Sequence, residues 1–191
     1  MNFFVRMIKH LILPGWQLRR AFSTESLGKI EQAIAVSEAQ HSAEIRFAVE
    51  SALDASALLR SQSAPARAID VFSALRVWDT EANNGVLLYL LLADCHVEIV
   101  CDRGLHAKID SAAWRMICRT MEVSFKQGNF EAGVLLGIEA ITEHLIKHFP
   151  RRNLATLSAN ELPNAPAVLY ARSARPRHGE EIGRGYRGTK A

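Results

Sequence analysis

Seven consecutive apolar residues, Val86–Leu92, constrain the fold of this chain more than any other feature. A strand without a polar position has no face to offer to water, so it belongs in the middle of a sheet that is covered on both faces. Val97–Cys101 follows and alternates apolar with mostly polar side chains, which is typical of a half-buried strand. We expect the two segments to form an antiparallel hairpin with a tight turn at Asp94 and Cys95.

One further strand and four helices are expected around this hairpin. Glu44–Glu50 alternates in the same way and predicts a half-buried strand. Apolar residues at helical spacing predict helices over about 24–40, 63–77, 111–128 and 134–149. A helix separates the first two strands, which favours a right-handed parallel crossover between them. The expected fold class is therefore α/β, an α-β-α sandwich with a mixed, mainly parallel central sheet and helices on both faces. The three tryptophans are expected to pack in the interior: Trp16, Trp78 and Trp114.

Charge is distributed unevenly along the 191 residues. Residues 1–22 have a net charge of +4, residues 23–150 of −6, and residues 151–191 of +5. This division predicts a basic amphipathic N-terminal arm, an α/β domain over 23–150 and a basic tail. The tail is rich in Arg, Gly, Ser and Pro and has no periodicity, so we expect it to be disordered.

The N-terminal arm allows three interpretations. Arg6 and Lys9 interrupt the apolar core that a signal peptide needs, and no cleavage site of small residues follows. The absence of acidic residues permits a mitochondrial presequence if the source is eukaryotic. The arm can also be a short helix packed on the domain, or a helix that lies at a membrane surface. Five apolar side chains would share one face of such an interfacial helix: Phe3, Phe4, Met7, Ile8 and Leu11.

The cysteines indicate a reducing compartment. Cys95, Cys101 and Cys118 have the spacing of neither a redox pair nor a zinc site. A domain of this size does not need disulfides, so we expect reduced thiols in a cytoplasmic protein, with a peripheral position at the inner membrane left open. No apolar run approaches the roughly 20 residues of a membrane-spanning helix.

Three segments carry a resemblance to a known family. Asn83–Leu88 reads NNGVLL, Val100–Leu105 ends in an Arg-Gly-Leu turn, and Phe125–Ala140 reads FKQGNFEAGVLLGIEA. In order and spacing they resemble the (D/N)NGVLL segment, the GRGL turn and the FRxGxYxxGLxxGxxA helix pair of the TPM domain family, a thylakoid-lumen-phosphatase-like domain. The resemblance covers about residues 30–149. Two shorter segments resemble a cytosolic-looking bacterial branch of the family: His41–Arg46 and Arg76–Thr80.

The resemblance implies an α/β sandwich with a mainly parallel sheet. Some members of the family are described as metal-binding, thylakoid members as acid phosphatases that assist photosystem repair, and others as auxiliary partners of membrane proteins. This chain departs from the family pattern at two positions. Asn83 stands where an acid often precedes Asn-Gly, and His106 where an acid often follows the Gly-Leu turn. Both departures weaken a carboxylate-rich cation site.

The hairpin predicts where a site would lie. With the turn at residues 94–95, Gly85 would oppose Gly104 and Asn83 would oppose His106. Glycines that face each other at a strand end indicate a close backbone approach or unusual φ values. The loop before the apolar strand and the turn after the next strand would then share one edge of the sheet.

Oxygen-bearing side chains gather at this edge. Asp79, Asn83 and Asp102 offer the carboxylate and amide oxygens that Ca²⁺ or Mg²⁺ prefers, so they are the expected metal ligands. The residues expected to contact a bound ligand are Asn84, Gly85, Arg103, Gly104 and His106. In the alternative interpretation, Asn84-Gly85 is only a turn and Asp79 only ends a helix.

No recognised phosphatase motif accompanies these residues. Cys101 lacks the arginine six positions later that a C-x₅-R loop needs, and no paired-aspartate, H-E-x-x-H or P-loop motif occurs. We therefore expect a non-catalytic binding or adaptor module with a divalent-cation site, which contacts a protein partner or an anionic membrane surface. The alternative is a metal-dependent phosphatase in which Asp79, Asp102 and a metal activate water.

The tail contains one misleading motif. Gly183–Gly188 fits G-x-G-x-x-G, but no strand precedes it, so it is not a dinucleotide site. Its arginines and tyrosine permit weak RNA contact through charge and stacking, whereas DNA binding is not expected.

Overall fold

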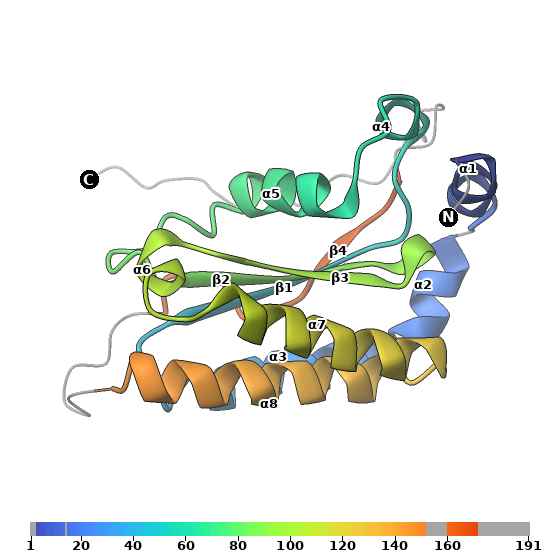
Figure 1. The fold of residues 1–191 in the computed structure, drawn as a ribbon. Coiled ribbons are helices and arrows are strands. Elements are labelled where there is room, and N and C mark those ends of the chain that lie inside the picture. The colour runs from blue at the N-terminus through green and yellow to red at the C-terminus, as the bar shows by residue number, and fades with distance from the viewer. Residues whose placement is uncertain (1–2, 14, 152–159, 172–191) are drawn as a thin grey trace, which may run out of the picture.

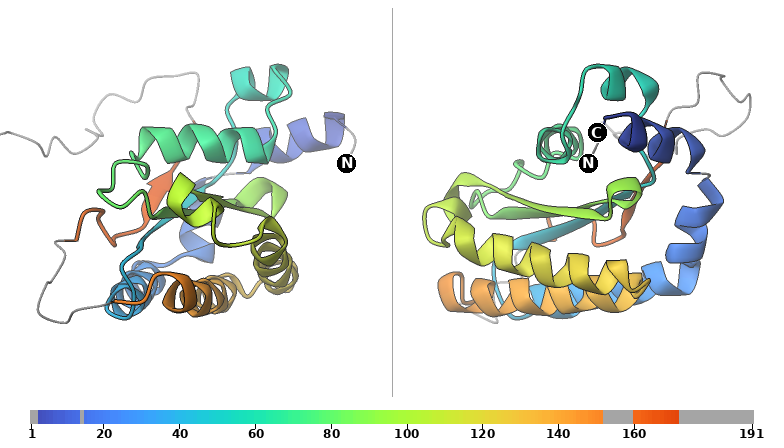
Figure 2. Two further views of the ribbon diagram at one scale, coloured as in Figure 1. Left: turned by 60° about the vertical axis from the view of Figure 1, so that its left-hand side comes forward. Right: turned by 45° about the vertical axis from the view of Figure 1, so that its right-hand side comes forward.

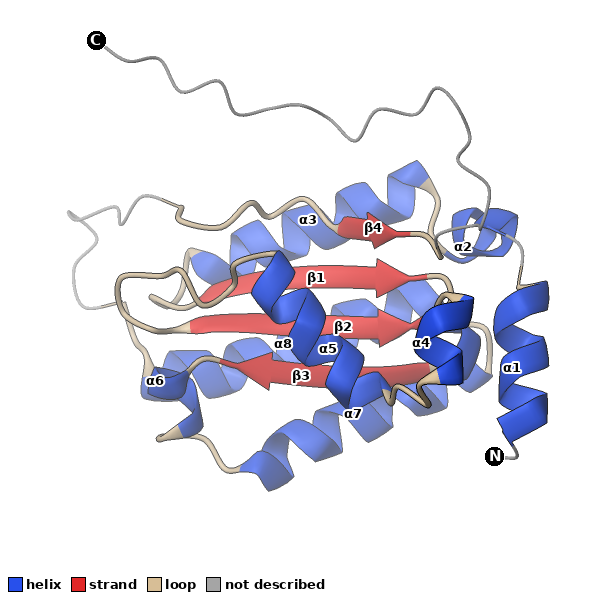
Figure 3. Cartoon of the chain, turned by 90° about the horizontal axis from the view of Figure 1, so that it is seen from above, coloured by secondary structure: helices blue, strands red, loops and turns tan. Residues whose placement is uncertain are grey.

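The computed structural model has a four-stranded sheet in the order β3-β2-β1-β4 (Figures 1 and 3). β1 (Glu44–Glu50) lies between β2 (Gly85–Leu91) and β4 (Ala167–Leu169) and is parallel to both. β3 (His96–Cys101) is antiparallel to β2. The expected mixed, mainly parallel sheet is thus confirmed. The structure describes residues 3–13, 15–151 and 160–171.

Helices cover both faces of the sheet, as the α-β-α prediction requires (Figures 1 and 2). α3 (Thr24–Glu38), α7 (Ser111–Lys126) and α8 (Phe130–His148) lie below the sheet in Figure 1. α5 (Ala64–Ala74) and the short α4 (Ala55–Leu59), which the sequence did not predict, lie above it.

β2 is the central strand that its apolar run predicts, because all seven positions are buried. Val86, Leu88 and Leu90 belong to the core cluster shared with α3, α7 and α8. Tyr89 and Leu91 point the other way, into the cluster shared with α4 and α5. The alternating side chains of β2 therefore belong to two separate hydrophobic cores, one on each face of the sheet.

The connection between β2 and β3 is longer than the predicted two-residue turn. Leu92–Asp94 forms a short 3₁₀ helix, η1, and Cys95 follows with a left-handed φ of 49°. The backbone N–H of Asp102 consequently donates to the Gly85 carbonyl, so Gly85 does not oppose Gly104. The predicted register was wrong because the extra turn residues shift the pairing along β3.

Residues 160–171 belong to the folded domain, contrary to the expectation of a disordered tail. β4 extends the sheet beyond β1, and the buried guanidinium of Arg46 donates to the carbonyl oxygens of Pro163 and Ala165. A three-residue strand is too short to leave an alternating pattern, which explains why the sequence did not reveal it. The Gly183–Gly188 motif lies outside the described residues.

β1 is buried at every position rather than half-buried, because β4 and the segment before it cover its outer side. Its polar side chains therefore need partners inside the protein. The Glu50 carboxylate accepts hydrogen bonds from Arg67 Nε at 2.8 Å, from Arg67 Nη2 at 2.9 Å and from the Tyr89 hydroxyl at 2.6 Å. This network ties α5 to β1 and β2.

Arg67→Met should lower the free energy of unfolding by about 2 to 3 kcal/mol, because it leaves the buried Glu50 carboxylate without its cation. The effect falls short of a fully buried pair because the Arg67 side chain is 31% exposed. The double variant Glu50→Gln/Arg67→Met should recover most of the loss. Urea unfolding of both variants checks this, and equal destabilisation of the two would contradict it.

The N-terminal arm forms two helices, α1 (Phe3–Ile12) and α2 (Gly15–Ala21). Leu18 and Phe22 are buried in the core cluster of α3 and β1, so this part of the arm packs on the domain. No helix in the described part of the chain has the length and apolar character needed to cross a bilayer. Only one tryptophan packs as predicted: Trp114 is buried, whereas Trp16 and Trp78 are exposed.

Candidate functional site

The candidate site lies at the end of the sheet where β1 and β2 begin and β3 ends (Figure 3). Two segments form it: the loop 79–84 before β2, and residues 102–106 after β3, which include the short helix α6 (Arg103–His106). We call these two segments the rim. The shared edge predicted from the sequence is present, although the strand register differs.

Close backbone contacts hold the rim together. A Cβ atom on Gly85 would lie 2.0 Å from the Val77 carbonyl oxygen, and one on Gly104 would lie 2.6 Å from the Asn83 carbonyl oxygen. The Gly104 N–H donates to that same Asn83 oxygen at 3.0 Å. Close backbone approaches occur at both glycines, but Gly85 approaches Val77 and Gly104 approaches Asn83, instead of each other.

Asn84 connects the rim to the start of β1 and is only 1% exposed. Its Nδ2 donates to the Ser42 carbonyl, its N–H donates to Thr80 Oγ1 at 3.1 Å, and its carbonyl accepts from the Glu44 N–H at 3.3 Å. Its Oδ1 is buried and finds no hydrogen-bond donor in the part of the chain that the structure describes. Asn84 therefore links the rim to β1 by hydrogen bonds and has one buried acceptor without a partner among the described residues.

Asp102 begins α6 and is 7% exposed. Its Oδ1 accepts from the Arg103 N–H at 2.6 Å, whereas its Oδ2 is buried without a donor among the residues described. The Arg103 side chain extends back over the rim, where Nη2 donates to Asn83 Oδ1 at 3.2 Å. The structure thus brings Asn83, Asp102 and Arg103 together.

The other predicted ligands lie apart from this group. Asp79 and His106 are exposed, and within the described residues no hydrogen bond or ion pair links either side chain to Asn83 or Asp102. His106 does not oppose Asn83 because Gly104 takes that place. Across residues 3–13, 15–151 and 160–171, no group of three or more His, Cys, Asp or Glu side chains is placed to hold a metal ion.

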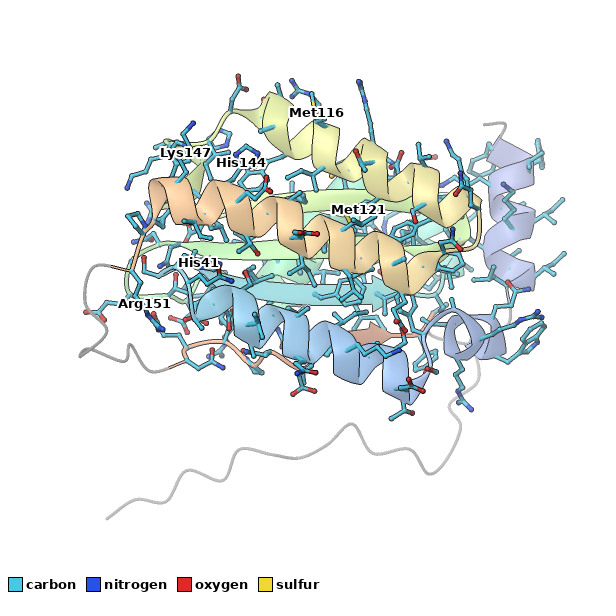
Figure 4. All side chains as sticks on the ribbon, turned by 90° about the horizontal axis from the view of Figure 1, so that it is seen from below. His41, Met116, Met121, His144, Lys147 and Arg151 are labelled. Carbon is cyan, nitrogen blue, oxygen red and sulfur yellow. The ribbon has the colours of Figure 1, made fainter. Side chains whose placement is uncertain are left out.

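A second polar feature, a cavity of about 210 Å³ near the start of β1, was not anticipated from the sequence. Its lining includes Glu38 at the end of α3, His41, Glu44 and Arg151. Figure 4 shows His41 and Arg151 at this end of the molecule. Glu38, His41 and Glu44 lie within seven positions of one another, but Arg151 comes from the segment after α8, so only the fold reveals the cavity.

Two titratable groups near this cavity have strongly shifted pKa values. Burial lowers the pKa of His41 to about 4, and its Nδ1 accepts the Ala43 N–H at 3.2 Å. The ring proton therefore lies on Nε2, which is 2.9 Å from Ser37 Oγ. Burial raises the pKa of Glu38 to about 7, even though its Oε1 accepts the Ile45 N–H at 2.7 Å.

A family model described as the TPM domain matches residues 18–144, more than half of the chain. The chain belongs to the TPM domain family. The family that the three sequence segments indicated is thereby confirmed. The matched part of this TPM domain protein contains the rim, whereas α1 and β4 lie outside it.

Two solved structures resemble this TPM domain protein. The BA42 protein from the psychrophilic bacterium Bizionia argentinensis, determined by NMR, is 31% identical, covers 77% of this chain and 94% of its own, and has a TM-score of 0.66. The N-terminal domain of a P. gingivalis protein is 22% identical over 69% of this chain and 83% of its own, with a TM-score of 0.51, and supports the fold alone. No curated protein matches the chain.

Proposed function

We propose that this TPM domain protein is a non-catalytic binding module that holds a divalent cation, Ca²⁺ or Mg²⁺, at the rim. The observation that carries the proposal is the Asp102 carboxylate, whose Oδ2 is buried and has no donor among the described residues. A buried acceptor without a partner costs free energy, and an acceptor that carries charge costs more. A cation supplies the missing partner.

Among the described residues, the rim contains a second unpaired oxygen of the kind that a hard cation prefers. Asn84 Oδ1 is a second buried acceptor without a donor among the described residues, and it belongs to the residue next to Gly85, which binds Asp102 through the backbone. Ca²⁺ and Mg²⁺ bind carboxylate and amide oxygens and complete their shells with water. Asp79 is exposed on the same loop and has no hydrogen bond to this group among the described residues, so the proposal does not rely on it. The Arg103 guanidinium opposes cation binding and limits its affinity.

The same geometry favours binding over catalysis. A metal-dependent phosphatase must fix its cation firmly enough to activate water and orient a phosphate. The rim offers one buried carboxylate, and no group of three acidic, His or Cys ligands converges in the described part of the chain.

Asp102→Asn should weaken Ca²⁺ or Mg²⁺ binding at least roughly tenfold, because it removes the only buried charge among the proposed ligands. The asparagine oxygen can still accept the Arg103 N–H, so the start of α6 is preserved. An NMR titration of the full chain with each cation should shift the amides of residues 83–85 and 102–104. Unshifted rim amides, or unchanged binding in Asp102→Asn, would contradict the proposal.

Two controls accompany this titration. Asp70→Asn removes an exposed acid from α5 and should leave cation binding unchanged. With a generic phosphomonoester and Mg²⁺ or Ca²⁺, we expect no turnover. Turnover that Asp79→Ala or Asp102→Ala abolishes would establish the metal-dependent phosphatase instead.

A further inference from the structure

α1 directs the side chains of Arg6 and His10 toward the protein. Arg6 Nε donates to Asp94 Oδ2 at 3.0 Å, and Arg6 Nη1 donates to the Gln62 carbonyl at 2.8 Å. One turn later, His10 is buried, with Nε2 3.0 Å from Asp94 Oδ1 and Nδ1 accepting the Leu53 N–H at 2.9 Å. These contacts fix the rotation of α1 about its own axis against η1 and the loops on both sides of α4.

The apolar side chains of α1 consequently point into solvent. Seven large apolar side chains within residues 3–16 are between 42 and 70% exposed: Phe3, Phe4, Val5, Ile8, Leu11, Ile12 and Trp16. Met7, which the sequence grouped with Phe3 and Phe4, packs against the protein instead. Isolated exposed apolar residues are ordinary, but six of them on one short helix, followed by Trp16 on α2, mark an interaction surface. We call the six residues of α1 the apolar face of α1.

Exposed cations accompany the apolar face on α1 and α2. Lys9, Arg19 and Arg20 are exposed, and residues 1–22 contain no acidic residue. The face continues into an apolar groove of about 440 Å³, whose lining includes Ile8, Ile12 and Phe130. Apolar and aromatic side chains edged by lysine and arginine are the pattern of helices that lie in the interface of anionic membranes.

The position of α1 allows contact with a flat surface. It stands at the far end of the molecule, beyond the ends of β1 and β2, so a plane can meet it without touching the helix layers (Figures 1 and 3). Because α1 is already folded and its rotation is fixed by Arg6 and His10, binding would not require a coil-to-helix transition.

We infer that α1 and α2 dock this protein on the surface of an anionic lipid bilayer. The apolar face of α1 enters the boundary between head groups and acyl chains, and Lys9, Arg19 and Arg20 contact the lipid phosphates. This inference is independent of the cation site at the rim, because it uses none of the rim residues.

Flotation of the full-length protein with vesicles tests the inference. Vesicles of phosphatidylcholine containing about one third phosphatidylglycerol should bind the protein, and vesicles of pure phosphatidylcholine should bind it far less. Phe4→Glu/Leu11→Glu should reduce binding by roughly tenfold or more for each side chain. Arg19→Gln/Arg20→Gln should reduce vesicle binding roughly fivefold for each charge removed. Added salt should also reduce vesicle binding.

A matched control distinguishes the face from general surface hydrophobicity. Met116→Glu replaces a similarly exposed apolar residue on α7, away from α1, and should bind vesicles like the wild type (Figure 4). Circular dichroism confirms that each variant is folded. Wild-type protein that fails to float, or Phe4→Glu/Leu11→Glu protein that floats equally well, overturns the inference. A wild-type dimer in solution that this variant converts to a monomer also overturns it, because the face would then bind a second copy.

Discussion

Gly85→Ala should lower the free energy of unfolding by about 3 kcal/mol or more. The added Cβ would lie 2.0 Å from the Val77 carbonyl oxygen and 3.0 Å from Val77 Cγ1. Val77 is fully buried, lies three residues beyond the end of α5, and donates its N–H to the Phe72 carbonyl at 3.0 Å, so it cannot move away without disturbing that helix. The variant should therefore shift the loop before β2 and the helix together. Denaturant unfolding followed by circular dichroism measures the loss.

Substitutions at two other glycines serve as comparisons for Gly85→Ala. Gly104→Ala should be less destabilising, because its Cβ would lie 2.6 Å from the Asn83 carbonyl oxygen in a loop that can yield. Gly28→Ala should stabilise the protein by about 0.5 to 1 kcal/mol, since it lies exposed inside α3 with no atom within 4 Å of the added Cβ. If Gly85→Ala were as stable as Gly28→Ala, the close approach at Val77 would not be a constraint on the fold.

The second large effect is a pH dependence that Glu38→Gln should reveal. Between pH 4.5 and pH 7, the unfolding free energy of the variant minus that of the wild type should rise by about 3 kcal/mol. The carboxyl group of unfolded Glu38 loses its proton near pH 4.5, whereas burial raises the pKa in the folded state to about 7. The folded wild type thus binds the extra proton, so its stability falls as the pH rises through this range. Glutamine does not titrate.

His41 acts in the opposite direction. Burial lowers its pKa from the usual 6.5 to about 4, so the folded state keeps the ring neutral. The stability that this neutral ring supports is present above pH 6.5 and is lost as the pH falls toward 4. The contributions of Glu38 and His41 oppose each other in the wild type, and Glu38→Gln leaves that of His41 uncompensated. Urea unfolding at several pH values checks both signs, with the exposed Glu31→Gln as control. Parallel curves for Glu38→Gln and the wild type would contradict the assignment.

The parts of the fold that the sequence predicts are those with a strong local pattern. The apolar run of β2, the alternation of β3 and the helical spacing of α7 and α8 all led to elements of the expected type. β4 was missed because it has three residues and is held by Arg46, whose partners Pro163 and Ala165 lie more than a hundred positions away. Long-range polar contacts leave no periodicity in a sequence.

The sequence predicted the location of the candidate site but not the strand register around it. The turn chemistry around Gly85 and Gly104 indicated the shared edge, and the structure places Asn83, Asp102 and Arg103 in contact there. The predicted register of β2 and β3 was wrong because Cys95 takes a left-handed conformation, which the surrounding sequence does not indicate. The orientation of α1 was equally hidden, since it depends on Asp94, over eighty residues from Arg6.

β2 separates the two surfaces of this molecule. Its first residue adjoins the rim, and its last residue leads into η1, where Asp94 holds α1. Seven strand residues span about 20 Å. If α1 binds a lipid bilayer, the length of β2 separates the rim from the lipid surface. A cation bound at the rim would then face the aqueous phase. Changes at the two ends should then combine without interfering.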